Sequence, residues 1–228
     1  MPPSRLRPRK TPVQARALET RSRILDAAAR VFSVRGYAAG TTNRIAAEAG
    51  LSIGSLYQYF PNKDAILVTL VRAHVTEGTE AVLAAVEQAR HLPAEDLAGR
   101  VRAIVDAVVS VHAGDPALHQ VLFEEAPRPP ELLDELRALE DGAVHVAAKL
   151  IAGRPPADLT HEDEMTARMV VTTIESLVHR LVATRQPRVA VDDVRREVTA
   201  VVVRYLAGGD RPEPGQGARR SSNRSVEK

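Results

Sequence analysis

Apolar residues recur at helical spacing along most of this 228-residue chain. Side chains three or four positions apart share one face of an α-helix, so each such run predicts one amphipathic helix. Prolines occupy the breaks between runs, and no alternation typical of strands competes with them. The pattern therefore predicts an all-α fold of about nine helices, which span residues 13 or 18 to 35, 42–49, 53–60, 63–90, 94–113, 116–123, 130–152, 162–186 and 191–207.

The lengths of these runs and the composition of the two ends suggest four parts. Residues 1–12 are rich in Pro and Arg and are expected to form a flexible basic arm. Residues 13–65 hold the first predicted helix and two short ones and form a small head, whereas residues 66–207 form a larger helical body. Residues 208–228 are rich in Gly, Ser and charge and are expected to be disordered.

Charge is distributed unevenly along the chain. The net charge is +2, but residues 1–35 hold nine Lys and Arg against two acidic residues. Basic ends often bind polyanions, although a solubilising tail explains the same composition equally well. Within the arm, the residues that would follow a nucleic-acid backbone or enter a minor groove are Arg5, Arg7, Arg9 and Lys10.

Composition also limits the compartment and the chemistry. The chain has no Cys, which excludes disulfides and thiolate metal sites. It contains no apolar run long enough to cross a bilayer and no signal-peptide core, so we expect a cytoplasmic protein.

The stretch 53–60 divides into two faces when it is drawn as a helix. With about 100° between successive side chains, Leu56 and Phe60 share one face and can pack inward. The remaining arc lacks the Lys and Glu pairs of an ordinary solvated helix and carries small, polar and aromatic residues instead: Gly54, Ser55, Tyr57, Gln58 and Tyr59.

The connection between the two short helices has the residues of a tight turn. Gly50 can adopt the left-handed conformation that ends the first helix, Leu51 can point inward, and Ser52 can cap the second helix. Two short helices joined in this way make a helix-turn-helix, whose second helix enters the major groove of DNA. Thr42 could cap the preceding helix and contact a phosphate, and Lys63 could contact a phosphate from the start of the next helix.

The stretch from Gly36 to Asp64 resembles the DNA-binding head of the tetracycline-repressor (TetR) family of bacterial transcription regulators. The residues that carry the resemblance are G36-Y37 and T41-T42-x-x-I45-A46-x-x-A49-G50-L51-S52-x-G54-x-L56-Y57-x-Y59-F60-x-N62-K63-D64. The resemblance covers roughly residues 18–67. It implies a homodimer that binds an operator with inverted symmetry, usually as a repressor released by a small ligand. It also implies DNA contacts at Thr42, Arg44, Ser52, Ile53, Gly54, Ser55, Tyr57, Gln58, Tyr59 and Lys63, although Ile53 could equally be a packing residue.

A second interpretation is a helical binding or interaction protein whose head no longer reads a specific operator. The intact Gly54, Tyr57 and Lys63 argue against it.

The last two predicted helices carry wide apolar stripes, which suit a four-helix interface between two copies. A crowded core within one chain would explain the same surplus. The interface residues expected from the stripes and from the resemblance are Val170, Ile174, Leu177, Val178, Leu181, Val194, Val198, Val201, Val202 and Tyr205.

The sequence says less about which residues of the body bind a ligand. A few polar residues embedded in apolar helices, with Phe123 and Met169 nearby, could line a pocket, although each could also be solvated or satisfied internally. The candidates are His112, Phe123, Met169, Thr172, Thr173, Ser176 and His179. Gly114 and Pro116 separate His112 from His119, and no histidine pair has the local spacing of a metal site. Ser110 and Ser176 lie in no nucleophile motif, so we expect no catalysis, no cofactor and no metal.

Overall fold

Every regular element that the structure describes is helical. The computed structural model describes residues 15–183 and 189–208, which contain nine α-helices and no strand, so the predicted all-α class is confirmed. The elements are α1 (Ala15–Ala39), α2 (Thr42–Glu48), α3 (Ile53–Tyr59), α4 (Lys63–Arg90), α5 (Leu97–Gly114), α6 (Pro116–Gln120), the π-turn η1 (Val121–Glu125), α7 (Pro130–Ala152), the 3₁₀ turn η2 (Pro156–Asp158), α8 (His161–Val178), the π-turn η3 (His179–Ala183) and α9 (Val191–Ala207).

Several predicted segments lie outside the described residues. These are the basic arm with Arg5, Arg7, Arg9 and Lys10, the end of the predicted helix 162–186, and the tail after Gly208. None of the described helices combines the length and the apolar character needed to cross a lipid bilayer.

Several predicted helices differ from the observed ones at their ends. The first breaks at Gly36, as predicted: that residue has φ 71° and ψ 173°, which kinks α1, and a further helical turn follows as far as Ala39. The predicted helices 116–123 and 162–186 both change into π-turns, at Val121 and at His179. Each π-turn widens the local helix and is a geometry that often accompanies functional sites.

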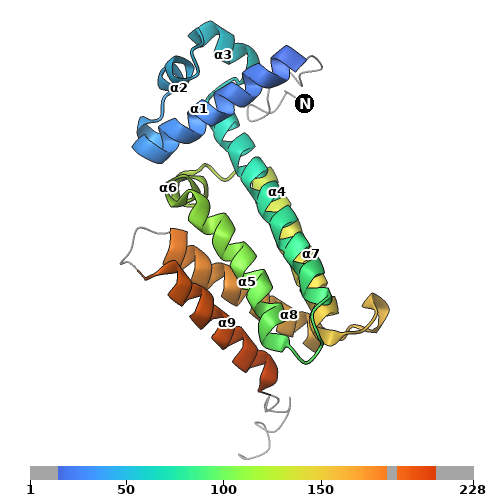
Figure 1. Ribbon diagram of the computed structural model, residues 1–228. Helices are drawn as coiled ribbons and strands as arrows, with labels where there is room; N and C mark the ends of the chain where they lie inside the picture. Colours follow the sequence, from blue (N-terminus) through green and yellow to red (C-terminus); the bar gives the residue numbers. More distant parts are fainter. Residues whose placement is uncertain (1–14, 184–188, 209–228) are drawn as a thin grey trace, which may run out of the picture.

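The helices α1, α2 and α3 gather at one end of the molecule, and the long helix α4 leads from them along the body (Figure 1). α7 lies beside α4, while α5, α8 and α9 form the rest of the body. α6 and η1 contact α1, so a second segment besides α4 joins the head helices to the body.

The larger of the two main core clusters crosses this junction. It contains Phe32, Leu56 and Phe60 from the head helices, and also Val121 and Leu122 from η1. The core around α1–α3 therefore continues past residue 65, because η1 supplies part of the apolar surface that α1 needs to be buried.

The second core cluster joins α5, α8 and α9. Valines dominate it, among them Val101, Val105 and Val109 of α5. Their branched side chains pack between helices and exclude water, which is the main favourable term in folding.

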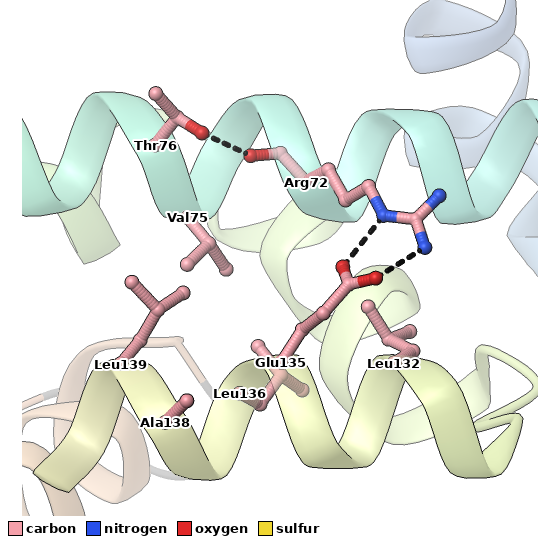
Figure 2. Close-up of a pocket in the computed structure, with 8 residues that line it drawn as sticks. All are labelled: Arg72, Val75, Thr76, Leu132, Glu135, Leu136, Ala138 and Leu139. Atoms are coloured by element: carbon pink, nitrogen blue, oxygen red, sulfur yellow. Dashed lines mark hydrogen bonds and ion pairs between the residues drawn. The ribbon is translucent and has the colours of Figure 1, made fainter.

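An ion pair on the molecular surface joins α4 to α7. Arg72 donates from Nε and Nη2 to the two carboxylate oxygens of Glu135, at 2.7 and 2.8 Å (Figure 2). Next to this ion pair, Leu132, Leu136 and Leu139 of α7 line a small pocket together with Val75 of α4. Because both charged groups are exposed, the pair orients the helices more than it stabilises them.

Gly40 provides a test of the packing at the end of α1. A Cβ atom at this buried position would lie 2.4 Å from Cδ1 of Phe32, whose side chain is fully buried. We expect Gly40→Ala to lower the free energy of unfolding by about 1–3 kcal/mol through overpacking. Chemical denaturation of the full chain measures this change.

Gly142 is the matched control for that measurement. It lies inside α7, and an added Cβ would meet no atom within 4 Å. Gly142→Ala should raise the free energy of unfolding by up to about 1 kcal/mol, because alanine favours a helix more than glycine does. Equal effects of the two substitutions would contradict the packing described for Gly40.

Candidate DNA-binding surface and body cavity

The turn between α2 and α3 forms as the sequence predicts. Gly50 has φ 65°, and its N–H donates to the carbonyl of Ala47 while that of Leu51 donates to Ala46. This pair of bonds is the Schellman arrangement that ends a helix at a left-handed glycine. Ser52 then caps α3, since its Oγ accepts from the N–H of Ser55 at 3.1 Å.

The two faces of α3 also divide largely as predicted. Leu56 and Phe60 are fully buried, whereas 40% of Tyr57 is exposed. The other exposed or half-exposed predicted contact residues on this surface are Ser52, Ile53, Gly54, Ser55 and Gln58. Tyr59 differs from the prediction of an outward position. It is half-buried and packs against the core, because its place near the end of α3 turns it toward the neighbouring helices.

Thr42 and Tyr57 meet at the edge between α2 and α3. Their side-chain oxygens are 3.2 Å apart, which is a hydrogen-bond distance. We expected Thr42 to cap α2, but Thr42 is the first residue of the helix and does not cap it. The cap is Thr41, whose side chain accepts from the N–H of Arg44. Thr42 is thus free of the capping role and contributes to the same edge as Tyr57.

Two predicted contact residues with basic side chains bind carbonyl groups of the chain itself. Lys63 donates from Nζ to the carbonyl of Tyr37 at 2.9 Å, and its ammonium lies 3.8 Å from the centre of the Tyr37 ring. Arg44 donates to the carbonyl of Ala39. Burial, together with a hydrogen bond to Asp64, raises the pKa of Tyr37, so this phenol stays neutral beside the lysine.

A cavity of about 1030 Å³ lies within the body. Its wall is mostly apolar and comes mainly from α4, α5, α7 and α8, with one residue each from α6, η1 and η3 and two residues from the end of α9. Five of the predicted ligand-binding residues line it: His112, Phe123, Thr172, Ser176 and His179.

Met169 and Thr173 do not line the cavity. They are four residues apart on α8 and therefore share one face, whereas Thr172 and Ser176 share another, which faces the cavity. Met169 is about half exposed instead. The rotation of about 100° per residue along the helix separates these two faces.

Four histidines from four elements meet in the cavity wall. They are His74 of α4, His112 of α5, His119 of α6 and His179 of η3. His119 lies between two of the others, with its Nδ1 3.0 Å from Nε2 of His74 and its Nε2 3.0 Å from Nδ1 of His179. The ring centres of His112 and His119 are 4.3 Å apart.

The sequence did not predict this cluster, because a helix break separates His112 from His119. α5 ends at Gly114, and Asp115 turns the chain and caps α6 through its carboxylate. The turn folds His119 back beside His112 instead of separating them. His74 and His179 come from distant parts of the chain, and no local spacing marks them as partners.

Burial lowers the pKa of all four imidazoles. The shift is largest for His119, whose pKa falls to about 2 because of burial first and then the neighbouring His112, His74 and His179. Burial is also the main cause for His74, His112 and His179. The four rings are therefore neutral near pH 7, when each ring has one N–H and one lone pair. Burial raises the pKa of the nearby Glu175.

Most of the residues expected at a dimer interface lie inside the chain. Val170, Ile174 and Val178 of α8 and Val194, Val198 and Val202 of α9 are buried against α5 in the second core cluster. The alternative of an intramolecular core therefore describes these six. Leu177 is half-buried, and the stripe residues left exposed on this side of the body are Leu181, Val201 and Tyr205.

Comparison with known proteins shows a match to two family models. Residues 24–70 match the model described as bacterial regulatory proteins, tetR family, and residues 96–206 match the tetracyclin repressor-like C-terminal domain. The chain is 32% identical over 127 residues to the uncharacterised HTH-type transcriptional regulator YdgC of Bacillus subtilis (strain 168), a match that covers 54% of this chain and 63% of that protein.

A longer match is the HTH-type transcriptional repressor KstR of Rhodococcus jostii (strain RHA1), with 26% identity over 198 residues and 85% of each chain covered. Among solved structures, a TetR-like transcriptional regulator from Rhodococcus sp. RHA1 superposes with a TM-score of 0.62 at 23% identity, over 83% of this chain and 96% of that one. This likeness shows that the two chains share a fold.

Tyr57 and Phe60 provide a test of the two faces of α3. Tyr57→Ala removes an exposed ring and should weaken binding to operator DNA with little change in thermal stability. Phe60→Ala truncates a fully buried ring and should lower the free energy of unfolding by roughly 3–5 kcal/mol. Fluorescence anisotropy with labelled DNA and thermal unfolding measure the two quantities, and similar behaviour of both variants would show that the faces are wrongly assigned.

Proposed function

This chain belongs to the tetR family of bacterial regulatory proteins, and we propose that it is a homodimeric repressor that binds a palindromic operator and leaves it when a small molecule binds. Family membership makes it a DNA-binding transcriptional regulator. One observation supports the proposal that a small molecule releases the protein from DNA. The exposed helix α3 belongs to a core that also contains η1, and η1 forms part of the wall of a large body cavity.

The proposed DNA-binding surface follows the exposed side of α2 and α3. Ser52, Gly54 and Gln58 are exposed with Tyr57, so the first turns of α3 can enter a major groove. The full proposed set is Thr42, Arg44, Ser52, Ile53, Gly54, Ser55, Tyr57, Gln58, Tyr59 and Lys63, in which the half-buried Tyr59 contributes only its exposed edge.

Lys63 can contact a phosphate without leaving its present partner. An ammonium group has three donors, and the carbonyl of Tyr37 takes one of them. The same contact fixes the position of the charge at the start of α4. The proposed role is therefore a preset backbone contact, which positions the protein on DNA but does not read its sequence.

The cavity determines the class of effector that we propose. Side chains such as Val82, Val101 and Leu150 make most of its wall apolar, while His74, Arg100 and Glu175 are among its few polar residues. Such a wall favours a molecule with an apolar body and one polar end, because buried polar groups need partners and apolar ones do not. A volume of about 1030 Å³ accommodates a molecule larger than a simple metabolite.

Two bonds and a shared core explain how the cavity can influence the head. Ser33 of α1 donates to Asp115, and the N–H of Tyr37 donates to Glu125, at 2.9 and 2.8 Å. Asp115 and Glu125 lie at the two ends of the α6–η1 segment. A ligand that moves this segment would change the position of α1, and a repressor dimer whose recognition helices are wrongly spaced loses its operator.

The proposed dimer contact uses the apolar residues that the chain leaves exposed on α8, η3 and α9. Leu181, Val201 and Tyr205 are each more than one third exposed. A C₂ dimer would bury them against their copies in the second chain. The proposed parts of the chain are the arm 1–12, the DNA-binding head 13–65, the ligand-binding and dimerisation body 66–207, and the tail 208–228.

A DNA-binding regulator of this kind acts in the bacterial cytoplasm, and we assign the chain no catalytic reaction.

The alternative function is that of a helical binding protein that reads no specific operator. Anisotropy measurements with DNA from beside its own gene separate the two, since the repressor should bind a segment containing an inverted repeat saturably and much more tightly than a scrambled segment of equal length. Binding that depends only on salt, with no preference between the two segments, would support the alternative.

Effector release has its own test, for which saturated fatty acids of increasing length are suitable probes. We expect one or more chain lengths to weaken operator binding by roughly 5- to 150-fold, the usual range of coupling between two sites. Ala143 lines the cavity, so Ala143→Trp should fill part of it and reduce this response while operator binding without ligand is retained.

His145, two residues farther along α7, provides the matched control. It is exposed and does not line the cavity, so His145→Trp adds the same ring outside it. This variant should respond to the fatty acids as the original chain does. An equal loss of response in both tryptophan variants would argue against the cavity as the effector site.

A further inference from the structure

Four of the seven histidines in this chain share one wall of the cavity. The other three, His91, His145 and His161, are exposed on the surface. His112 and His119 are buried, with 6% and 3% of their surface exposed, and His74 and His179 are half-buried beside them. Buried imidazoles from four separate elements are costly unless their nitrogens have partners, so what each ring nitrogen faces is informative.

The hydrogen bond of His112 to the backbone fixes which of its nitrogens has a free lone pair. Its Nδ1 lies 2.8 Å from the carbonyl of Val108, which can only accept, so Nδ1 carries the hydrogen. The neutral ring then has its lone pair on Nε2. That nitrogen points toward Glu175, whose nearer carboxylate oxygen is 3.6 Å away.

His119 and His179 bring two more nitrogens to the same place. One nitrogen of each of the three rings lies within 4.8 Å of the others. Nε2 of His119 and Nδ1 of His179 are already 3.0 Å apart. Two nitrogens bound tetrahedrally to Zn²⁺ at its usual bond length are separated by about 3.3 Å, so this pair is already near the required separation, and the nitrogen of His112 lies within 4.8 Å of both.

The outer nitrogens of the three rings are held in the manner typical of metal ligands. Nδ1 of His112 faces the carbonyl of Val108, Nδ1 of His119 faces His74, and Nε2 of His179 lies 3.8 Å from Glu124. Ligating histidines usually direct their second nitrogen to a carbonyl or a carboxylate, which fixes the tautomer and the direction of the ring. Here His112 has a backbone carbonyl in this role and His119 has the imidazole of His74, while the carboxylate of Glu124 lies within ion-pair distance of His179 but beyond a hydrogen bond.

We propose that His112, His119 and His179 bind a divalent transition-metal ion of the Zn²⁺ class inside the body cavity. Imidazole nitrogens favour Zn²⁺, Co²⁺, Ni²⁺ and Cu²⁺, whereas Mg²⁺ and Ca²⁺ favour oxygen. His74 is the positioning residue behind His119. Glu175 or a water molecule completes the coordination from the cavity side, and the negative charges of Glu124 and Glu175 offset that of the ion.

Binding the ion requires no net loss of protons from the imidazoles. In the free cluster a proton lies between Nε2 of His119 and Nδ1 of His179, and another between His119 and His74. When the metal takes both inner lone pairs, His119 carries its hydrogen on Nδ1 and donates to Nε2 of His74, which in turn carries its hydrogen on Nδ1. His112 carries its hydrogen on Nδ1 and His179 on Nε2, so each ring still has one hydrogen and the three ligands and His74 all remain neutral.

The test uses the full chain without a polyhistidine tag, freed of metal by a chelator. Zn²⁺ alone is titrated calorimetrically, and Co²⁺ is added separately to record its visible absorption. We expect one Zn²⁺ per chain, and absorption bands of tetrahedral Co²⁺ that Zn²⁺ abolishes. Zn²⁺ should also raise the melting temperature, because the ion binds the assembled cluster in the folded chain.

Substitutions distinguish ligands from their surroundings. His112→Gln and His179→Gln should each weaken Zn²⁺ binding by more than the about 10- to 100-fold that loss of an outer partner causes. His74→Gln should fall within that range. His145→Gln changes a surface imidazole and should bind as the original chain does, and circular dichroism in metal-free buffer checks that every variant is folded.

Two results would overturn the proposal. One is the absence of stoichiometric Zn²⁺ binding by the folded original chain, which would leave the cluster as a self-contained set of hydrogen-bonded imidazoles. The other is equal Zn²⁺ affinity in His179→Gln and His145→Gln, which would place the ion on the surface. Neither measurement involves DNA, so metal binding and operator binding can fail independently.

Discussion

The short segment formed by α6 and η1 has to satisfy two environments at once. Val121 and Leu122 point into the core around α1, while His119 and Phe123 face the cavity. Asp115 caps the segment at its start and also accepts from Ser33 of α1, so the same carboxylate orients the segment and attaches it to the head. Successive residues of η1 point in different directions around its axis, so Leu122 can face the core while Phe123 faces the cavity. The packing of the head and the shape of the cavity both depend on this segment.

The histidine cluster shows how an apolar cavity can contain polar rings. Each imidazole loses hydration when it is buried, and that loss is offset only by hydrogen bonds within the cluster and to the backbone. His112 obtains one from Val108, and His119 obtains two from His74 and His179. Phe123 stacks on His119 with ring centres 4.4 Å apart, which restricts how far that ring can rotate. The result is a rigid polar patch in a wall that is otherwise suited to apolar ligands.

Local physics made the head predictable from sequence. The left-handed Gly50, the cap at Ser52 and the inward pair Leu56 and Phe60 depend on neighbours within a few residues, and all four behave as predicted. Tyr59 is less exposed than predicted because the packing around the end of its helix decides its position.

The body was predictable only in its helices. Its stripes of valine fit a core within the chain or a contact between chains equally well, and only the position of α5 shows that six of the predicted interface residues are internal. The histidine cluster depends on the turn at Asp115 and on two distant segments that supply His74 and His179, so neither periodicity nor local spacing could reveal it.

The proposed metal site and the proposed effector site share a wall, and that limits how they can act. His119 belongs to α6, and η1 continues from it directly into the head core, so a change at this ring is adjacent to the contacts that hold α1. α4 is a second connection, but it is a continuous helix of 28 residues whose first turns are buried in the head core. A continuous helix resists bending, so a displacement of its cavity portion would move the head as a rigid unit. Displacement of α6 and η1 would instead change the angle between head and body. An effector that contacts His119 therefore acts on the more adjustable of the two connections, and an ion bound to the same ring would set the position from which that adjustment begins.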